Sequence, residues 1–230
     1  MRSAGLFMIV DDDKAVLLRA RHSYDVNARN APPANYFLEK ISIPRGKRDG
    51  DDTFDYETAV REFIEETATV FDSAFVYNTP FVLQWNDAGV VYKYAIYVGI
   101  LRGVLKSVLR EPNSFCVKLR TSDNEPNKYN VDIESRRFNN ELRRNLHITT
   151  LADYFRYMNE TQLTTYAASN YLEFFKFVRD VKAQFDDGRL FDFFLITLKL
   201  NNWDLFDKWN LRRPKIVSAT RRELMNIVNV

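Results

Sequence analysis

The stretch AVREFIEETA, residues 59–68, places three glutamates, Glu62, Glu65 and Glu66, within about one and a half turns of a helix. The apolar residues around them recur at helical spacing on the other side, so the pattern predicts an amphipathic helix from Asp55 to Thr67. Like charges at this spacing repel each other by a few tenths of a kcal/mol. The acidic side is therefore either a solvated surface or the place where a cation is held.

A basic loop precedes this helix. The segment IPRGKRDG, residues 43–50, follows a predicted strand and contains two glycines, Gly46 and Gly50, which permit tight backbone turns. Main-chain N–H groups in such a turn can face phosphate oxygens. The cationic side chains of the loop are Arg45, Lys47 and Arg48.

Carboxylates on the helix and cations on the loop together suit a metal-bridged polyphosphate. A hard divalent cation such as Mg²⁺ takes a few carboxylates and completes its shell with water and substrate phosphate. Glu62, Glu65 and Glu66 are the predicted metal ligands, and Arg61 is expected to hold a glutamate in position. A solvated acidic face is the alternative for the helix alone, and the basic loop before it favours the metal site.

Composition narrows the class of protein. The chain has 230 residues, of which 46% are hydrophobic and 28% charged, and its formal net charge is +2, compatible with a phosphate-bearing partner. A single cysteine, Cys116, excludes an internal disulfide framework, and two separated histidines, His22 and His147, leave little for a zinc site. No apolar stretch has the length that crosses a bilayer, and the N-terminus is unlike a signal peptide. We therefore expect a soluble intracellular protein, in the cytoplasm or the nucleus.

The order of elements predicts an α/β core followed by a mostly helical extension. Two strands flank the acidic turn at residues 11–14, a third precedes the basic loop, and further strands follow the helix up to about residue 101. A less regular stretch comes next. Three later segments have the pattern of amphipathic or buried helices, at residues 148–158, 170–185 and 190–200. The predicted division is a core over residues 1–148 and an extension packed on it over residues 149–230.

The basic loop and acidic helix resemble the signature of the Nudix hydrolases, in which a glycine and a glutamate precede Arg-Glu-apolar-x-Glu-Glu. Residues 61–66, REFIEE, match the second half of the signature. Between Gly46 and Arg61 there is one residue more than the pattern has, so Asp52 or Glu57 replaces the early glutamate. Ala68 stands where the family has glycine, and Thr69 where it has an apolar residue.

This resemblance implies an α/β/α sandwich and Mg²⁺- or Mn²⁺-dependent hydrolysis of a nucleoside diphosphate linked to a further group. It makes Glu62, Glu65 and Glu66 the metal ligands and Arg61 the residue that orients them. Many members place a general base outside the box. Here Glu134 is the preferred candidate, and Glu125 and Glu141 remain alternatives.

The substrate is predicted less directly. Residues 44–47, PRGK, look like the loop of mRNA-decapping members, and a basic extension suits a long RNA, so the sequence favours cap hydrolysis with release of 7-methyl-GDP. Overall the chain is similar to Nudix proteins of large DNA viruses, which include baculovirus ADP-ribose pyrophosphatase-type and poxvirus decapping-type members. ADP-ribose is therefore the alternative substrate. A non-catalytic RNA- or nucleotide-binding module is a second alternative.

Two further predictions concern binding surfaces. A base or cap guanine needs aromatic walls, for which Tyr36, Phe37 and Trp85 are candidates, with ordinary core packing as the alternative for each. The C-terminal helices are candidates for a homodimer interface.

Overall fold

The computed structural model describes residues 3–20, 40–87, 89–122, 125–135, 144–163 and 168–201. The elements are β1 (Ser3–Val10), β2 (Lys14–Ala20), β3 (Ile41–Ser42), β4 (Arg45–Lys47), α1 (Asp55–Thr67), β5 (Thr69–Tyr77), β6 (Phe81–Asp87), β7 (Val90–Ser107), β8 (Phe115–Thr121), β9 (Lys128–Ser135), β10 (Arg144–Thr150), α2 (Leu151–Tyr157), the π-helical turn η1 (Met158–Gln162), α3 (Tyr171–Asp186) and β11 (Phe193–Leu200).

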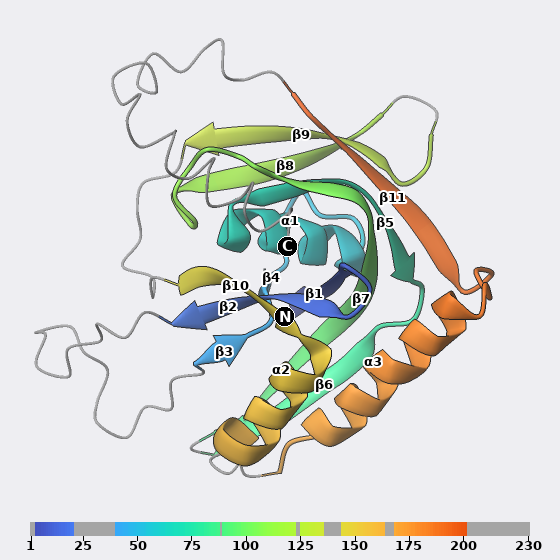
Figure 1. Cartoon of the computed structure of the whole chain (residues 1–230). Helices are drawn as coiled ribbons and strands as arrows, with labels where there is room; N and C mark the ends of the chain where they lie inside the picture. Colours follow the sequence, from blue (N-terminus) through green and yellow to red (C-terminus); the bar gives the residue numbers. More distant parts are fainter. Residues whose placement is uncertain are drawn as a thin grey trace, which may run out of the picture.

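The strands form one mixed sheet in the order β10-β2-β1-β7-β5-β11-β9-β8, with β3 beside β2, β4 beside β1 and β6 beside β7. The β1–β7 and β11–β9 pairs are parallel, and the other pairs are antiparallel. Figure 1 shows the sheet curving around α1, while α2 and α3 lie on its outer side.

The central strand β1 contributes to two cores because its side chains alternate between the faces of the sheet. Leu6 and Met8 join the cluster that contains the apolar face of α1. Phe7 and Ile9 join a second cluster with the buried side chains of α2 and α3. Helices thus cover both faces of the sheet, which confirms the predicted α/β/α arrangement.

The acidic turn between the first two strands is also confirmed. Asp11 and Asp12 both have positive φ angles, 46° and 64°. Three residues, Asp11 to Asp13, join the paired strand ends Val10 and Lys14, and aspartate tolerates the left-handed conformation of the first two.

Helix α1 has its predicted bounds and a defined cap at each end. At its start, one oxygen of Glu57 accepts the N–H groups of Thr53 (2.6 Å) and Phe54 (2.9 Å). At its end, Ala68 takes the left-handed conformation with φ 53°, at the position where the Nudix signature has glycine. Ala68 thus adopts a conformation that glycine takes more readily.

Two predictions about secondary structure are wrong. Residues 193–200, predicted as part of a helix, form strand β11, which inserts between β5 and β9. Ile196 and Leu198 are buried, and their neighbours along the strand are more exposed. This alternation is typical of a strand, but it is hard to recognise in a short run of mostly apolar residues. The stretch described as less regular contains the hairpin of β8 and β9.

The other two predicted helical segments are helical. The apolar sides of α2 and α3 are buried against the sheet through the second cluster, which includes Tyr154, Phe155, Phe174 and Phe175. These helices therefore complete a layer of the sandwich. The division into a core and an extension stays a prediction.

Candidate active site

The guanidinium of Arg61 connects the acids of α1 with the loop before it. Its side chain is 7% exposed. Nη2 donates to the carbonyl oxygen of Lys47 (2.7 Å) and to Asp52 Oδ2 (3.1 Å). Nη1 donates to Glu62 Oε1 (2.9 Å) and Glu65 Oε2 (3.2 Å). Arg61 therefore contacts two of the three signature glutamates.

The acid that holds Arg61 is Asp52. Its carboxylate also accepts the hydroxyl of Thr58 (2.8 Å) and the N–H of Asp49 (3.0 Å). Burial works against the charged form of Arg61, but its hydrogen bonds to Asp52 and the charges of Glu62 and Glu65 outweigh that effect, so its pKa rises above the ordinary value.

Asp52 and Glu57 were the two candidates for the early glutamate of the signature. Asp52 pairs with Arg61, whereas Glu57 caps the start of α1. Besides capping α1, Glu57 accepts the hydroxyl of Tyr129 on β9 at 2.8 Å. The loop between Gly46 and Arg61 has one residue more than the Nudix pattern. The Asp52–Arg61 ion pair forms despite this longer loop.

Gly46 lies directly against the carboxylate of Glu62. A Cβ atom at residue 46 would stand 2.1–2.3 Å from three atoms of that carboxylate, so any larger residue there would force the Glu62 carboxylate to move. Glycine at residue 46 therefore lets the backbone of the basic loop and the Glu62 carboxylate lie in contact as they do here.

The charge of Glu66 is perturbed by its surroundings. Its Oε2 accepts the N–H of Arg45 at 2.8 Å. Burial raises the pKa of Glu66 to about 8; Arg144 and the Arg45 N–H oppose the rise, and the negative charge of Glu62 adds to it. A nearby cation reverses such a shift, because it favours the charged form of the acid. The crowding of Glu62 and Glu66 is thus of the kind that a divalent metal relieves.

Glu65 points to a different part of the fold. Its Oε1 accepts the N–H of Val117 on β8 at 2.7 Å, and its Oε2 faces Arg61. Within the described ranges, no group of three or more His, Cys, Asp or Glu side chains is arranged to hold a metal ion. Glu62 and Glu65 share Arg61, while Glu65 and Glu66 each accept a backbone N–H, from Val117 and Arg45 respectively.

The three cations of the basic loop have different roles. The Arg45 guanidinium lies 4.9 Å from the ring centroids of both Trp85 and Tyr94, in cation–π contact. Arg48 donates to the carbonyl oxygens of Asp52 (2.8 and 2.9 Å) and Thr53 (2.6 Å). Two of the three predicted phosphate contacts therefore hold protein groups, and both Lys47 and Arg48 are exposed.

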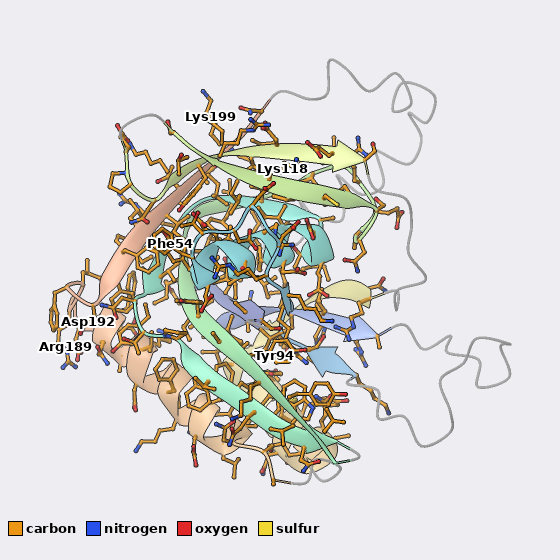
Figure 2. All side chains as sticks on the ribbon, turned by 180° about the vertical axis from the view of Figure 1, so that it is seen from behind. Phe54, Tyr94, Lys118, Arg189, Asp192 and Lys199 are labelled. Carbon is orange, nitrogen blue, oxygen red and sulfur yellow. The ribbon has the colours of Figure 1, made fainter. Side chains whose placement is uncertain are left out.

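The aromatic candidates differ in accessibility. Trp85 is 6% exposed, and its ring stacks on those of Tyr92 (5.4 Å) and Tyr94 (5.5 Å). This arrangement fits core packing, the alternative to base stacking for this residue. Tyr36 and Phe37 lie outside the described residues. Sequence reasoning did not consider Phe54, which precedes α1 (Figure 2) and is 53% exposed. Its ring stacks on that of Tyr56 at a centroid distance of 5.3 Å.

The candidate general base is not brought to the acids of α1. Glu134 on β9 is paired with Lys118 at 3.4 Å, and its side chain is 53% exposed. Its neighbour Ile133 packs toward α1, so strand alternation puts Glu134 on the other face of the sheet. Glu125 pairs with Lys128 in the turn between β8 and β9. Glu141 lies outside the described residues.

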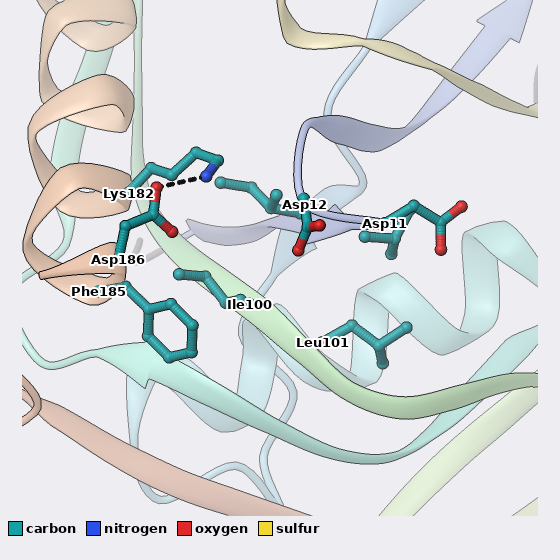
Figure 3. A pocket seen from close by; sticks show the side chains of 9 residues that line it. Asp11, Asp12, Ile100, Leu101, Lys182, Phe185 and Asp186 are labelled. Atoms are coloured by element: carbon teal, nitrogen blue, oxygen red, sulfur yellow. Dashed lines mark hydrogen bonds and ion pairs between the residues drawn. The ribbon is translucent and has the colours of Figure 1, made fainter. Parts of the chain in front are cut away.

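A cavity of about 150 Å³ lies elsewhere, between the β1–β2 turn, β7 and α3 (Figure 3). Its floor is apolar, and its rim carries Asp11, Asp12 and the Lys182–Asp186 ion pair. None of its lining residues belongs to α1 or to the basic loop. It is therefore separate from the candidate active site.

Sequence reasoning also missed Arg144, at the start of β10. Its Nη1 donates to the hydroxyl of Ser42 at 2.9 Å, and its charge acts on Glu66. Nothing in the local pattern around residue 144 indicates this, because the contact depends on how β10, β2 and β3 pair.

Comparison with known proteins identifies relatives, although no protein-family model matches the chain. The protein named "Protein ADP-ribose pyrophosphatase ORF38" of Autographa californica nuclear polyhedrosis virus is 57% identical over 200 residues, covering 86% of this chain and 91% of the relative. An "Uncharacterized 24.3 kDa protein" of Orgyia pseudotsugata multicapsid polyhedrosis virus is 54% identical over 197 residues, with the same coverage. Among the described residues, no helix has the length and apolar character to span a membrane.

Proposed function

Since this chain belongs to the Nudix hydrolases, enzymes that cleave pyrophosphate bonds, and is a close relative of baculovirus members, we propose that its substrate is ADP-ribose. The products would be AMP and ribose 5-phosphate. The observation that carries this proposal is the 57% identity to a protein named as an ADP-ribose pyrophosphatase, over 86% of the chain. It reverses the preference for the RNA cap that the loop sequence suggested.

The geometry of the loop supports the same change of preference. Cap hydrolysis was favoured because of residues 44–47, PRGK, and the cations around them. Arg45 lies against two rings and Arg48 donates to two backbone carbonyls, so both side chains already have contacts within the protein. Capped RNA remains a second candidate because Lys47 of the same loop is exposed.

For the metal, we propose Mg²⁺ or Mn²⁺ held by Glu62 and Glu66, with Glu65 as the third predicted ligand. The first two acids fit a cation best, because their charges act on one another and burial makes an unpaired charge costly. A divalent ion bound there would polarise the phosphoryl group and lower the pKa of an attacking water. Phosphate oxygens and water would complete its coordination.

The roles of the remaining residues follow from their contacts. Asp52 fixes Arg61, and Arg61 fixes Glu62 and Glu65, so the acids are oriented before substrate arrives. Gly46 brings the backbone of the loop against Glu62, and the Arg45 N–H orients Glu66. We assign no residue as the general base, because Glu134 lies on the other face of the sheet.

Substrate choice is tested by incubating the protein with Mn²⁺ and, in separate reactions, ADP-ribose and cap-labelled RNA. We expect AMP and ribose 5-phosphate from the first reaction. Release of 7-methyl-GDP without hydrolysis of ADP-ribose would overturn the proposal in favour of decapping. Binding of RNA that is indifferent to metal and yields no product would point to the non-catalytic module.

The site is tested by E66Q, with E173Q as a matched control that makes the same change at an exposed position of α3. Residues that only support metal ligands contribute roughly 10- to 100-fold, so loss of a ligand should lower kcat by more than about 100-fold. E173Q should leave kcat unchanged. A fully active E66Q would remove Glu66 from the mechanism.

Self-association through the C-terminal helices also stays a proposal. The apolar sides of α2 and α3 are buried within the chain, so a dimer would use their outer sides. Light scattering at several protein concentrations measures the mass directly.

A further inference from the structure

Strand β10 places Arg144 on the face of the sheet that carries the catalytic helix. Leu146 and Ile148 pack against the cluster that contains the apolar side of α1. Residues two apart on a strand point to the same face, so Arg144 lies on that face as well. The pairing of Arg144 with Ala20 of β2 fixes this register.

A buried hydroxyl holds the Arg144 side chain in place. Nη1 donates to Ser42 Oγ at 2.9 Å, and Ser42 is 0% exposed. Ser42 belongs to β3, and three residues later the Arg45 N–H binds Glu66. The same short segment of chain therefore anchors a cation and one of the signature acids, and the charge of Arg144 opposes the rise in the pKa of Glu66.

One donor of this guanidinium is not satisfied within the described part of the chain. Arg144 Nε is buried and has no hydrogen-bond partner there. Buried donors on charged groups are nearly always paired in native proteins, so an exception calls for a specific explanation. A guanidinium presents its donors as a planar fork that matches phosphate oxygens, and binding an anion would satisfy it.

The other arginines near the acids already have protein partners. Arg61 binds Asp52, Glu62 and Glu65. Arg45 and Arg48 contact rings and backbone carbonyls, respectively. Among these arginines, Arg144 lies on the α1 face of the sheet, is held by Ser42, and has a buried donor without a partner in the described part of the chain.

We propose that Arg144 binds the phosphate oxygens of the substrate's diphosphate, beside the acids of α1. The inference rests on the proposed function for its substrate class, a nucleoside diphosphate derivative. The guanidinium would supply a second positive charge for the diphosphate, besides that of a metal ion that the acids of α1 would hold. The residue serves binding more than proton transfer, because arginine keeps its charge at neutral pH.

The test compares R144A and R144K with R120A. Arg120 is a matched control, since its side chain is 67% exposed and it pairs with Asp132 on β9. With saturating Mn²⁺ and ADP-ribose, we expect R144A to raise KM by about tenfold or more. R144K should recover part of the loss, because it keeps the charge but not the fork. R120A should match the unsubstituted protein.

A second readout does not depend on turnover. Calorimetry with the α,β-methylene analogue of ADP-ribose in EDTA measures diphosphate binding without metal. R144A should bind the analogue at least about tenfold more weakly, and added guanidinium ions should restore part of the affinity. Equal affinity and equal KM in folded R144A or R144K would overturn the proposal.

The two proposals fail differently. If the unsubstituted protein binds the analogue through Arg144 but does not hydrolyse ADP-ribose, the substrate assignment is wrong and the phosphate contact stands. If it hydrolyses ADP-ribose and the Arg144 variants are unaffected, the phosphate contact is wrong and the substrate assignment stands.

Discussion

The two faces of the sheet are built from different kinds of interaction. In the described chain, the buried charged residues all lie on α1 or in the loop before it: Asp52, Glu57, Arg61 and Glu65. The opposite face, under α2 and α3, is filled by aromatic and aliphatic side chains, with Gln162 as its buried polar group. Gln162 is itself bonded to both the N–H and the carbonyl of Ile41.

The difference separates stability from function. Burying charge is costly and is tolerated where each ion has a partner, whereas apolar packing stabilises without such conditions. We therefore expect damage under α2 and α3 to lower stability alone, and damage on the α1 face to lower both stability and catalysis. Four substitutions test that distinction.

The largest effect is expected from D52A. It leaves Arg61 buried without its main partner, and removing one member of a buried ion pair costs roughly 3–5 kcal/mol. Because Arg61 orients Glu62 and Glu65, kcat should also fall by roughly 10- to 100-fold. Urea unfolding and steady-state kinetics measure the two effects.

The control for D52A is D51A, one residue away. The Asp51 side chain is 76% exposed and 3.9 Å from Lys118, so its loss should change stability by less than about 0.5 kcal/mol. Equal effects of the two variants would show that the Asp52–Arg61 pair does not organise the site.

On the opposite face, F174A should cost roughly 3–5 kcal/mol in unfolding free energy. Phe174 is fully buried and contacts the rings of Phe7 and Phe81 at centroid distances of 5.4 and 5.5 Å. The kcat of the folded fraction should be unchanged. F191A, at a position 80% exposed, is the control for losing a phenyl ring. A large drop in kcat for F174A would mean that the two faces are not independent.

The pH dependence of metal-free protein sharpens the comparison. Because the folded pKa of Glu66 is raised from 4.5 to about 8, the folded state keeps a proton that the unfolded state has lost. Stability therefore falls as pH rises through this window. E66Q lacks this group, so its unfolding free energy relative to the unsubstituted protein should increase by about 3 kcal/mol from pH 5 to pH 8.

The measurement for E66Q is chemical unfolding in EDTA at several pH values. Adding Mn²⁺ should reduce the difference at pH 8, because a bound cation stabilises the charged carboxylate of the unsubstituted protein. If the difference in unfolding free energy between E66Q and the unsubstituted protein stays constant with pH, the pKa of Glu66 is not raised in the folded state.

The smallest effect concerns the end of α1. Ala68 adopts a left-handed conformation, which costs a non-glycine residue roughly 1–2 kcal/mol, so A68G should relieve strain. It also removes a buried methyl group worth about 0.8 kcal/mol, which leaves a net gain of about 0.5 kcal/mol. A183G, at an exposed position inside α3, should instead lose about 1 kcal/mol. Thermal unfolding of both variants should show opposite signs.

Local patterns predicted a good part of this fold. The bounds of α1, the acidic hairpin turn and two of the three C-terminal helical segments follow from periodicity and turn chemistry within a few residues. Strand β11 and the β8–β9 hairpin were not predicted. Their pairing partners lie far along the chain, and a short apolar run fits a buried helix as well as a strand.

For the active site, sequence alone determined that α1 would carry Glu62, Glu65 and Glu66 beside Arg61, because neighbours at helical spacing are set by the helix itself. Tertiary structure decided that Asp52 and not Glu57 pairs with Arg61, that Glu65 binds the N–H of Val117, and that Arg144 binds the hydroxyl of Ser42. These contacts join elements distant in sequence, and strand register and loop closure set them.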